Sequence, residues 1–253
     1  MNLRFINISL DETIGDIQYR LWFEYHTRFI SNYLSRKIRS YHYSTDGSFD
    51  MINIDVGTER NPQIVVNNVL EVYLPFDQER YNKVKGTNDH SYYIEMFRHG
   101  FHQAYLFKNI PIVELNSLLD EFESNHCKHI WIHLKRTLKT AKLRVELIAQ
   151  FTTNNYTLTA NFYDLSKSEL LCTGTLIKTL PDEVFFSRTI KDVIDDSEKV
   201  IFLDYNLNNL IIMNVSDIRA KCFKFSFSDC AYQDDEKAIE THKELIQYLS
   251  YNG

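Results

Sequence analysis

The stretch Leu143–Tyr163, LRVELIAQFTTNNYTLTANFY, decides the fold class that we predict for this chain. It contains two runs with apolar residues at alternate positions, Leu143–Phe151 and Tyr156–Tyr163, separated by the turn-forming residues Thr153, Asn154 and Asn155. Alternation of period two is typical of a half-buried strand, and a short polar turn between two such runs is typical of an antiparallel hairpin. This stretch therefore predicts antiparallel β structure.

The strand-like pattern extends in both directions from this hairpin. Further runs of this kind are Lys128–Leu134, Leu170–Leu180, Val200–Tyr205, Leu210–Val215 and Lys221–Phe227. The segment Phe185–Ile194 fits either a strand or a short helix. We expect residues 128–227 to form a predominantly antiparallel sheet, in a meander.

Helical periodicity marks four other segments. A long amphipathic helix is predicted from Asp11, which is a suitable N-cap, to Ile38. Further helices are expected to begin near Asp89, near Pro111 and near Asp234, and to pack with the first around the antiparallel sheet. Shorter strands are predicted at Leu3–Ile8, Phe49–Val56 and Gln63–Leu74. Because the helices are collected early and in the middle while the strands run consecutively, the fold class is α+β.

The domain organisation that we expect is a single α+β domain over residues 1–253. The alternative is a subdivision into residues 1–85 and 86–253, because the polar run Asp77–Asp89 is the best candidate for a junction.

The charge balance argues against nucleic acid as a partner. The chain carries 28 Lys and Arg against 34 Asp and Glu, for a formal net charge of −6. Nucleic-acid binding requires a basic face that displaces counterions. The one basic stretch, with Lys135, Arg136, Lys139, Lys142 and Arg144, is expected to be a solvated turn between strands.

Other features of the composition predict a cytoplasmic, non-catalytic protein. The 4 cysteines form no C-x-x-C pair, which favours a reducing compartment, and we see no secretory leader and no apolar run of membrane-spanning length. The 7 glycines are scattered singly, so no phosphate-binding loop or nucleophile elbow is present. We therefore expect no cofactor and no membrane partner.

Three histidines near the middle of the chain raise the question of a metal. On a helix, His126, His129 and His133 would share one face, but the alternation of Ile130–Leu134 predicts a strand. We therefore predict no metal site, and the alternative is a metal-assisted hydrolase that uses this cluster.

Acidic clusters provide the candidate contact surface for a protein partner. The candidate partner-binding residues are Asp195, Asp196, Glu198, Asp234, Asp235 and Glu236. Turns and helix starts also favour acids, which would explain these positions without a partner. A structural or scaffolding homo-oligomer is the remaining alternative.

The order of elements from Tyr92 to Phe186 resembles immunity proteins of bacterial polymorphic-toxin systems. An amphipathic helix with the sequence YYIEMFRHGF (92–101) is followed by a helix ending near Phe122, by Trp131 in a strand, by a meander and by the corner Leu180–Glu183. The resemblance covers under half of the chain and assigns no residue a role. It implies a stoichiometric inhibitor of a toxin domain, acting here through an acidic, tyrosine-rich surface.

Overall fold

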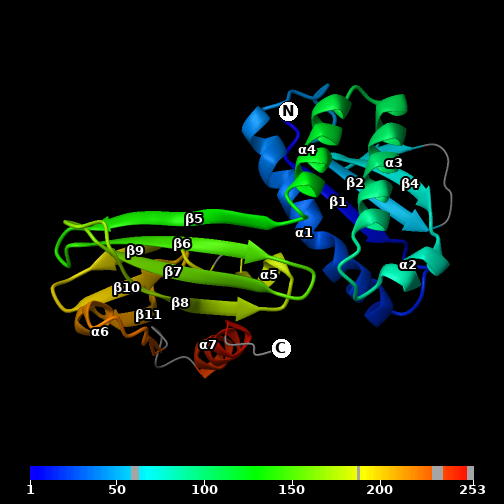
Figure 1. Ribbon diagram of the computed structural model, residues 1–253. Coiled ribbons are helices and arrows are strands. Elements are labelled where there is room, and N and C mark those ends of the chain that lie inside the picture. The colour runs from blue at the N-terminus through cyan, green and yellow to red at the C-terminus, as the bar shows by residue number, and fades with distance from the viewer. Residues whose placement is uncertain (58–62, 187–188, 230–235, 250–253) are drawn as a thin grey trace. The chain divides into compact units, whose positions relative to one another are not determined.

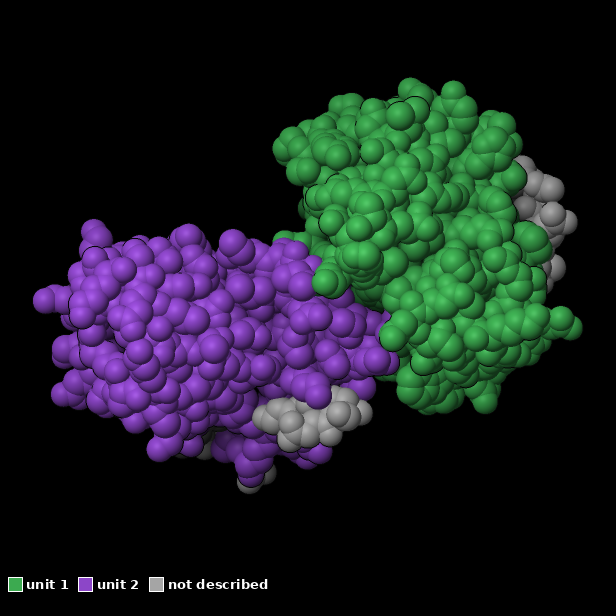
Figure 2. All heavy atoms as spheres, viewed as in Figure 1, with its two compact units in different colours: residues 1–129 green, residues 130–253 purple. Residues whose placement is uncertain are grey.

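The chain forms two compact units, Met1–His129 and Ile130–Gly253 (Figure 2). The computed structural model describes residues 1–57, 63–186, 189–229 and 236–249. The fold combines helices with sheets whose strands are antiparallel in the C-terminal half, so the predicted α+β class is confirmed. The division between the units falls after His129, so it does not coincide with the alternative boundary after residue 85.

The first unit is a mixed four-stranded sheet with helices (Figure 1). Its strands lie in the order β1-β2-β4-β3; β1, β2 and β4 are parallel, and β3 is antiparallel to β4. Its elements are β1 (Phe5–Leu10), α1 (Ile17–Tyr41), β2 (Met51–Gly57), β3 (Ile64–Val66), β4 (Val69–Pro75), α2 (Gln78–Val84), α3 (Ser91–Phe107) and α4 (Ile112–Ser124). We predicted that the long helices surround the antiparallel sheet; α1, α3 and α4 belong instead to this first unit, where α1 and α3 cover parallel strands.

The segment Gln63–Leu74 is a hairpin, so the prediction of one continuous strand is wrong. Asn67 and Asn68 have φ values of 50° and 65° and form a two-residue turn between β3 and β4. Asparagine tolerates this left-handed conformation better than most residues do. Val66 pairs with Val69, so it lies on the face opposite to Leu70, although both fit the same alternation in the sequence.

Helix α1 begins after Asp16, five residues later than we predicted. Gly15 has a φ of +61°, which an α-helix cannot contain, and the side chain of Asp16 accepts a hydrogen bond of 2.8 Å from the backbone N–H of Tyr19. The Asp11 carboxylate instead accepts from the backbone of Thr13 at 2.8 Å and stabilises the preceding loop. Ile17, the first residue of α1, is 70% exposed.

The core of the first unit lies between the helices and one face of the sheet. Ile52, Ile54 and Val56 of β2 are fully buried on this face. Gly100 of α3 lies directly on Ile54, because a Cβ atom at this glycine would be 2.3 Å from the Cδ1 atom of Ile54. Along the free edge of β1, the Ser35 hydroxyl of α1 accepts from the backbone N–H of Ile6 at 2.9 Å. The helix thereby provides a partner for a backbone N–H of an edge strand, which would otherwise be open to pairing with another strand.

The second unit contains the predicted meander but forms two antiparallel sheets instead of one (Figure 1). The strand orders are β5-β6-β7-β8 and β12-β11-β10-β9. The register of β6 and β7 runs from Leu143 opposite Asp164 to Phe151 opposite Tyr156, which confirms the predicted hairpin. The elements are β5 (His129–Leu138), β6 (Leu143–Phe151), β7 (Tyr156–Asp164), β8 (Leu170–Thr179), α5 (Glu183–Phe186), β9 (Asp192–Asp195), β10 (Lys199–Leu203), β11 (Asn209–Asn214), α6 (Val215–Arg219), β12 (Ser226–Phe227) and α7 (Glu236–Leu249).

Three predictions for the second unit are refined by these bounds. The ambiguous segment Phe185–Ile194 contains both the end of a short helix, α5, and the start of a strand, β9. The expected strand Lys221–Phe227 is reduced to the two residues of β12. The predicted closing helix corresponds to α7, which contacts β8.

Side chains join the two sheets of the second unit along β5 and the turn after it. The backbone carbonyl of Ile190 accepts from the Nε2 atom of His133 at 3.0 Å, and Arg136 pairs with Asp192 at 2.5 Å. In the core, the ring of Phe162 in β7 meets that of Phe202 in β10 edge to face, with centroids 6.4 Å apart. The sheets therefore share one core and a bridged edge.

Candidate functional site

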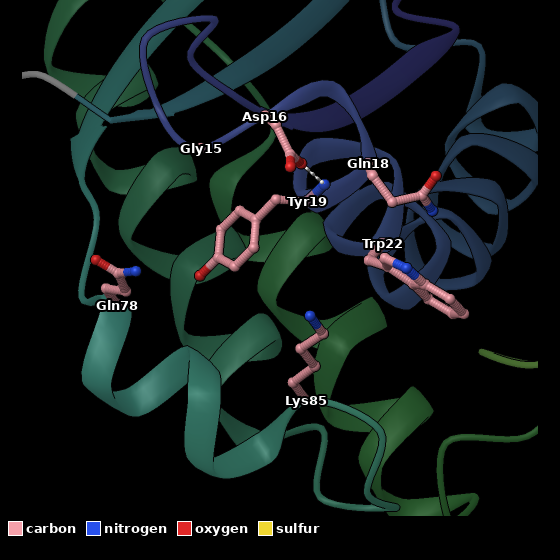
Figure 3. A pocket seen from close by; sticks show the side chains of 7 residues that line it. All are labelled: Gly15, Asp16, Gln18, Tyr19, Trp22, Gln78 and Lys85. Carbon is pink, nitrogen blue, oxygen red and sulfur yellow. Dashed lines mark hydrogen bonds between the residues drawn. The ribbon is translucent and has the colours of Figure 1, made fainter.

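A hollow of about 440 Å³ opens in the first unit, where β1 leads into α1 and β4 leads into α2 (Figure 3). Ligands of sheets with parallel strands usually bind at this end, outside the carboxyl ends of the strands. The residues that line the hollow are Gly15, Asp16, Gln18, Tyr19, Trp22, Gln78 and Lys85. We call this group the Trp22 hollow.

The loop between β1 and α1 gives the Trp22 hollow a fixed wall. Gly15 approaches Tyr19 so closely that a Cβ atom would lie 2.8 Å from its ring. The guanidinium of Arg20 donates to the backbone carbonyls of Glu12 and Gly15, both at 2.9 Å. The carboxylate of Asp16 is committed to the N-cap of α1. These interactions hold the loop in a defined conformation.

Lys85 supplies a cation that no carboxylate of the described residues neutralises. Its Nζ atom lies 5.1 Å from the ring centroid of Tyr19 and 5.8 Å from that of Tyr81. An ammonium group over aromatic faces is attracted by their quadrupoles. The amino group points into the hollow, toward Tyr19 (Figure 3). It is therefore oriented by the two tyrosines and available to a further anion.

Trp22 is a large aromatic side chain at the rim of the hollow, and it is 45% exposed. Its ring stacks on His26, with centroids 6.1 Å apart and an interplanar angle of 27°, and meets the edge of Tyr25 at 6.0 Å. The indole is thus supported from below and from the side while one face stays open to solvent. An aromatic group in such a position loses little conformational entropy when it binds.

The layer beneath Trp22 is buried and uncharged at neutral pH. Burial, together with the positive charge of Lys85 and the neighbouring His90, lowers the pKa of His26 to about 4. Burial also raises the pKa of Tyr81 far above its usual value. The neutral His26 and Tyr81 therefore form an aromatic layer behind the lining rings of Trp22 and Tyr19.

The lining of the hollow consists mainly of aromatic and hydrogen-bonding side chains. Asp16 and Lys85 are the charged side chains that line the hollow, and Asp16 is occupied as a helix cap. A catalytic site requires a nucleophile or acid next to a base that is held in a productive orientation. The remaining lining groups are amides, an indole and a phenol, which donate and accept hydrogen bonds.

The predicted acidic surface is only partly free for a partner. Asp195 accepts a hydrogen bond of 2.6 Å from the backbone of Ala141, and Asp196 accepts from the backbones of Glu198 and Lys199 at 2.7 and 2.6 Å. The contacts of Asp196 close the turn between β9 and β10, and that of Asp195 joins β9 to the turn between β5 and β6, while the Glu198 side chain is exposed. Asp234 and Asp235 lie outside the described residues, and for Glu236, the first residue of α7, only the backbone is described.

The three histidines of the alternative metal site have separate surroundings. His126 lies in a turn with a φ of 56°, and His129 is buried, with its Nε2 atom 2.6 Å from the Oδ1 atom of Asn32. His133 bonds to the backbone of Ile190. Within the part of the chain that the structure describes, no group of three or more His, Cys, Asp or Glu side chains could hold a metal ion. The structure does not bring these imidazoles together as ligands.

A polar row on the other face of the first sheet was not predicted. Asn53 of β2 accepts from Asn7 of β1 at 2.9 Å and donates to Glu71 of β4 at 2.8 Å. The three residues are directly opposite one another in the registers of the strands. Polar residues between apolar neighbours, as in the sequences INI and LEV, were the available signal.

The Trp22 hollow was also missed, because its residues are far apart in the sequence. Trp22 lies within the helix that we predicted from Asp11 to Ile38, and its exposure is visible only in the structure. Gln78 and Lys85 belong to a segment that we treated only as a polar junction. Their convergence depends on the parallel pairing of β1, β2 and β4, which the sequence pattern does not reveal.

Comparisons of this chain with protein-family models, with curated proteins and with solved structures find no match. Among the helices that the structure describes, none has both the length and the apolar character needed to cross a membrane.

Proposed function

We propose that this chain is a protein-binding module, and that its partner contacts the Trp22 hollow. The observation that carries the proposal is the exposed, supported indole of Trp22 at the rim of a hollow that contains the unneutralised Lys85. A few tryptophan, tyrosine and arginine anchors provide most of the affinity of protein interfaces. The side chains of Gln18 and Gln78, which also line the hollow, add polar groups to its wall.

We propose that this module neutralises a toxin by binding to it. This role agrees with a site that has binding groups but no catalytic pair among its lining residues. The resemblance gave this role to an acidic surface, whereas two of the three acids at the β9–β10 turn accept hydrogen bonds from backbone N–H groups of the chain itself. We therefore assign the main contact to the Trp22 hollow, with the exposed Glu198 as the residue for testing the acidic surface.

The test begins with capture of the partner from the native cell by the full chain, with mass spectrometry to identify it. Trp22→Ala is then compared with Tyr105→Ala, because Tyr105 is also an exposed aromatic residue of a first-unit helix, at 49%. Loss of a central tryptophan anchor costs about 2 kcal/mol or more, which weakens the affinity roughly thirtyfold. We expect this loss for Trp22→Ala alone.

Two results would contradict the proposal. One is equal affinity of Trp22→Ala and the wild-type chain, with folding verified by urea unfolding. The other is a catalytic activity of the purified chain that survives Trp22→Ala. A loss caused only by Glu198→Lys would return the contact to the predicted acidic surface.

A further inference from the structure

The ammonium group of Lys85 is held in place before any ligand arrives. Its distances of 5.1 and 5.8 Å to the ring centroids of Tyr19 and Tyr81 restrict a side chain that otherwise has many rotamers. No carboxylate of the described residues forms an ion pair with it. Binding an anion here therefore costs less conformational entropy than at an unrestrained lysine.

Hydrogen-bond donors line the same hollow as this cation. The carboxamides of Gln18 and Gln78 and the indole of Trp22 line the same hollow as Lys85 (Figure 3). Each carboxamide has two N–H donors and the indole has one. A group with several lone pairs and a negative charge pairs with the lysine and accepts from the donors within its reach.

The charge of the hollow selects the type of anion. One lysine and no arginine line it, and the Asp16 carboxylate is also at its wall. A phosphate dianion would meet a single cation and a repelling carboxylate, whereas a carboxylate has one charge to neutralise. We infer that the ammonium group of Lys85 forms an ion pair with an aspartate or glutamate side chain of the partner, next to an apolar group of the partner that packs on Trp22. This inference rests on the proposed protein-binding function.

The inference is tested without the partner, by NMR titration of the full-length, ¹⁵N-labelled chain. The probe is N-acetylglutamate N-methylamide, and the matched neutral probe is N-acetylglutamine N-methylamide. We expect the charged probe to shift the Trp22 indole signal and to bind about two- to fivefold more tightly than the neutral one, as for a partly exposed ion pair. The indole signal of Trp131, in the second unit, reports on nonspecific effects.

Three variants test the role of Lys85. Lys85→Met keeps the apolar stem and removes the charge, so we expect the preference for the charged probe to disappear; Lys85→Gln does the same if the first variant folds poorly. Lys83→Met removes an exposed lysine of α2 two residues away and keeps the preference. Equal binding of the two probes to the wild-type chain, or an undiminished preference in Lys85→Met, would overturn the inference. Tighter binding of methyl phosphate than of the charged probe would overturn the choice of a carboxylate.

These results separate the inference from the proposed function. If capture of the partner requires Trp22 but the probes bind equally, the carboxylate site is wrong and the binding module stands. If the charged probe is preferred but Trp22→Ala leaves capture unchanged, the carboxylate site stands and the proposed function is wrong.

Discussion

The contact between Gly100 and Ile54 predicts that Gly100→Ala destabilises the wild-type chain but stabilises a chain that already carries Ile54→Ala. In the wild-type chain, Gly100→Ala would introduce a methyl group 2.3 Å from the Cδ1 atom and 2.6 Å from the Cγ1 atom of Ile54. Carbon atoms prefer separations of about 3.5–4.0 Å. The fully buried Ile54 must therefore move within a packed core, which costs about 1–3 kcal/mol.

Helix propensity acts in the opposite direction. Alanine is about 1 kcal/mol better than glycine inside a helix, so Gly100→Ala has a net cost of about 0–2 kcal/mol. Ile54→Ala alone costs about 2–5 kcal/mol, since it leaves a cavity. In the Ile54→Ala background the new methyl group fills part of that cavity, and Gly100→Ala becomes stabilising by about 1 kcal/mol.

The assay is urea unfolding, monitored by the fluorescence of Trp22, of four chains: the wild type, Gly100→Ala, Ile54→Ala and the double variant. Trp131→Phe in all four removes the second indole signal. We expect a coupling of about 1–3 kcal/mol between the two sites. If Gly100→Ala has the same effect in both backgrounds, within about 0.5 kcal/mol, the packing of α3 on β2 described here is wrong.

Three further predictions follow from buried and hydrogen-bonded groups. Burial lowers the pKa of His129 to about 3 and that of His26 to about 4, so below pH 6.5 the unfolded chain binds protons that the folded chain does not. In urea titrations we therefore expect the free energy of unfolding to fall by about 1.4 kcal/mol per pH unit per histidine down to pH 4.5, and His129→Gln to remove about half of this slope. Asn53→Asp puts a carboxylate opposite Glu71, and we expect it to destabilise the chain by about 1 kcal/mol at pH 7. Protonation relieves the repulsion at pH 4.5, so an equal loss of stability at both pH values in thermal unfolding would contradict this prediction. Asp195→Ala leaves the backbone N–H of Ala141 without its partner and lowers the free energy of unfolding by about 1–2 kcal/mol, whereas Glu198→Ala, at an exposed position, changes it by less than about 0.5 kcal/mol. Equal effects of the two variants in urea unfolding would be inconsistent with the structure.

The part of the fold that the sequence predicts best is the part that depends on local alternation. The bounds of β6 match the predicted strand, and those of β7 and β8 differ by one residue at one end. In β6 and most of β7 the buried residues alternate with more exposed ones, so the period of two is visible. Pairing between neighbours in the sequence then needs only a short turn.

The first unit is less predictable because its sheet is built from strands that are distant in the sequence. The 25 residues of α1 separate β1 from β2, and β3 intervenes between β2 and β4. Nothing in the alternation of Met51–Gly57 says whether its neighbours are parallel. The candidate site follows from that pairing, since β1 and β4 carry Asp16 and Gln78 to the same end of the sheet.

The most direct test of the proposed contact is hydrogen–deuterium exchange of the full chain, free and bound to the captured partner. We predict slower exchange of backbone amides at residues 15–22 and 78–85, which contain the residues that line the Trp22 hollow. Protection confined to the β9–β10 turn, residues 195–199, would instead support the acidic surface. Unchanged exchange at residues 15–22 and 78–85 would contradict the claim that the partner binds at the Trp22 hollow.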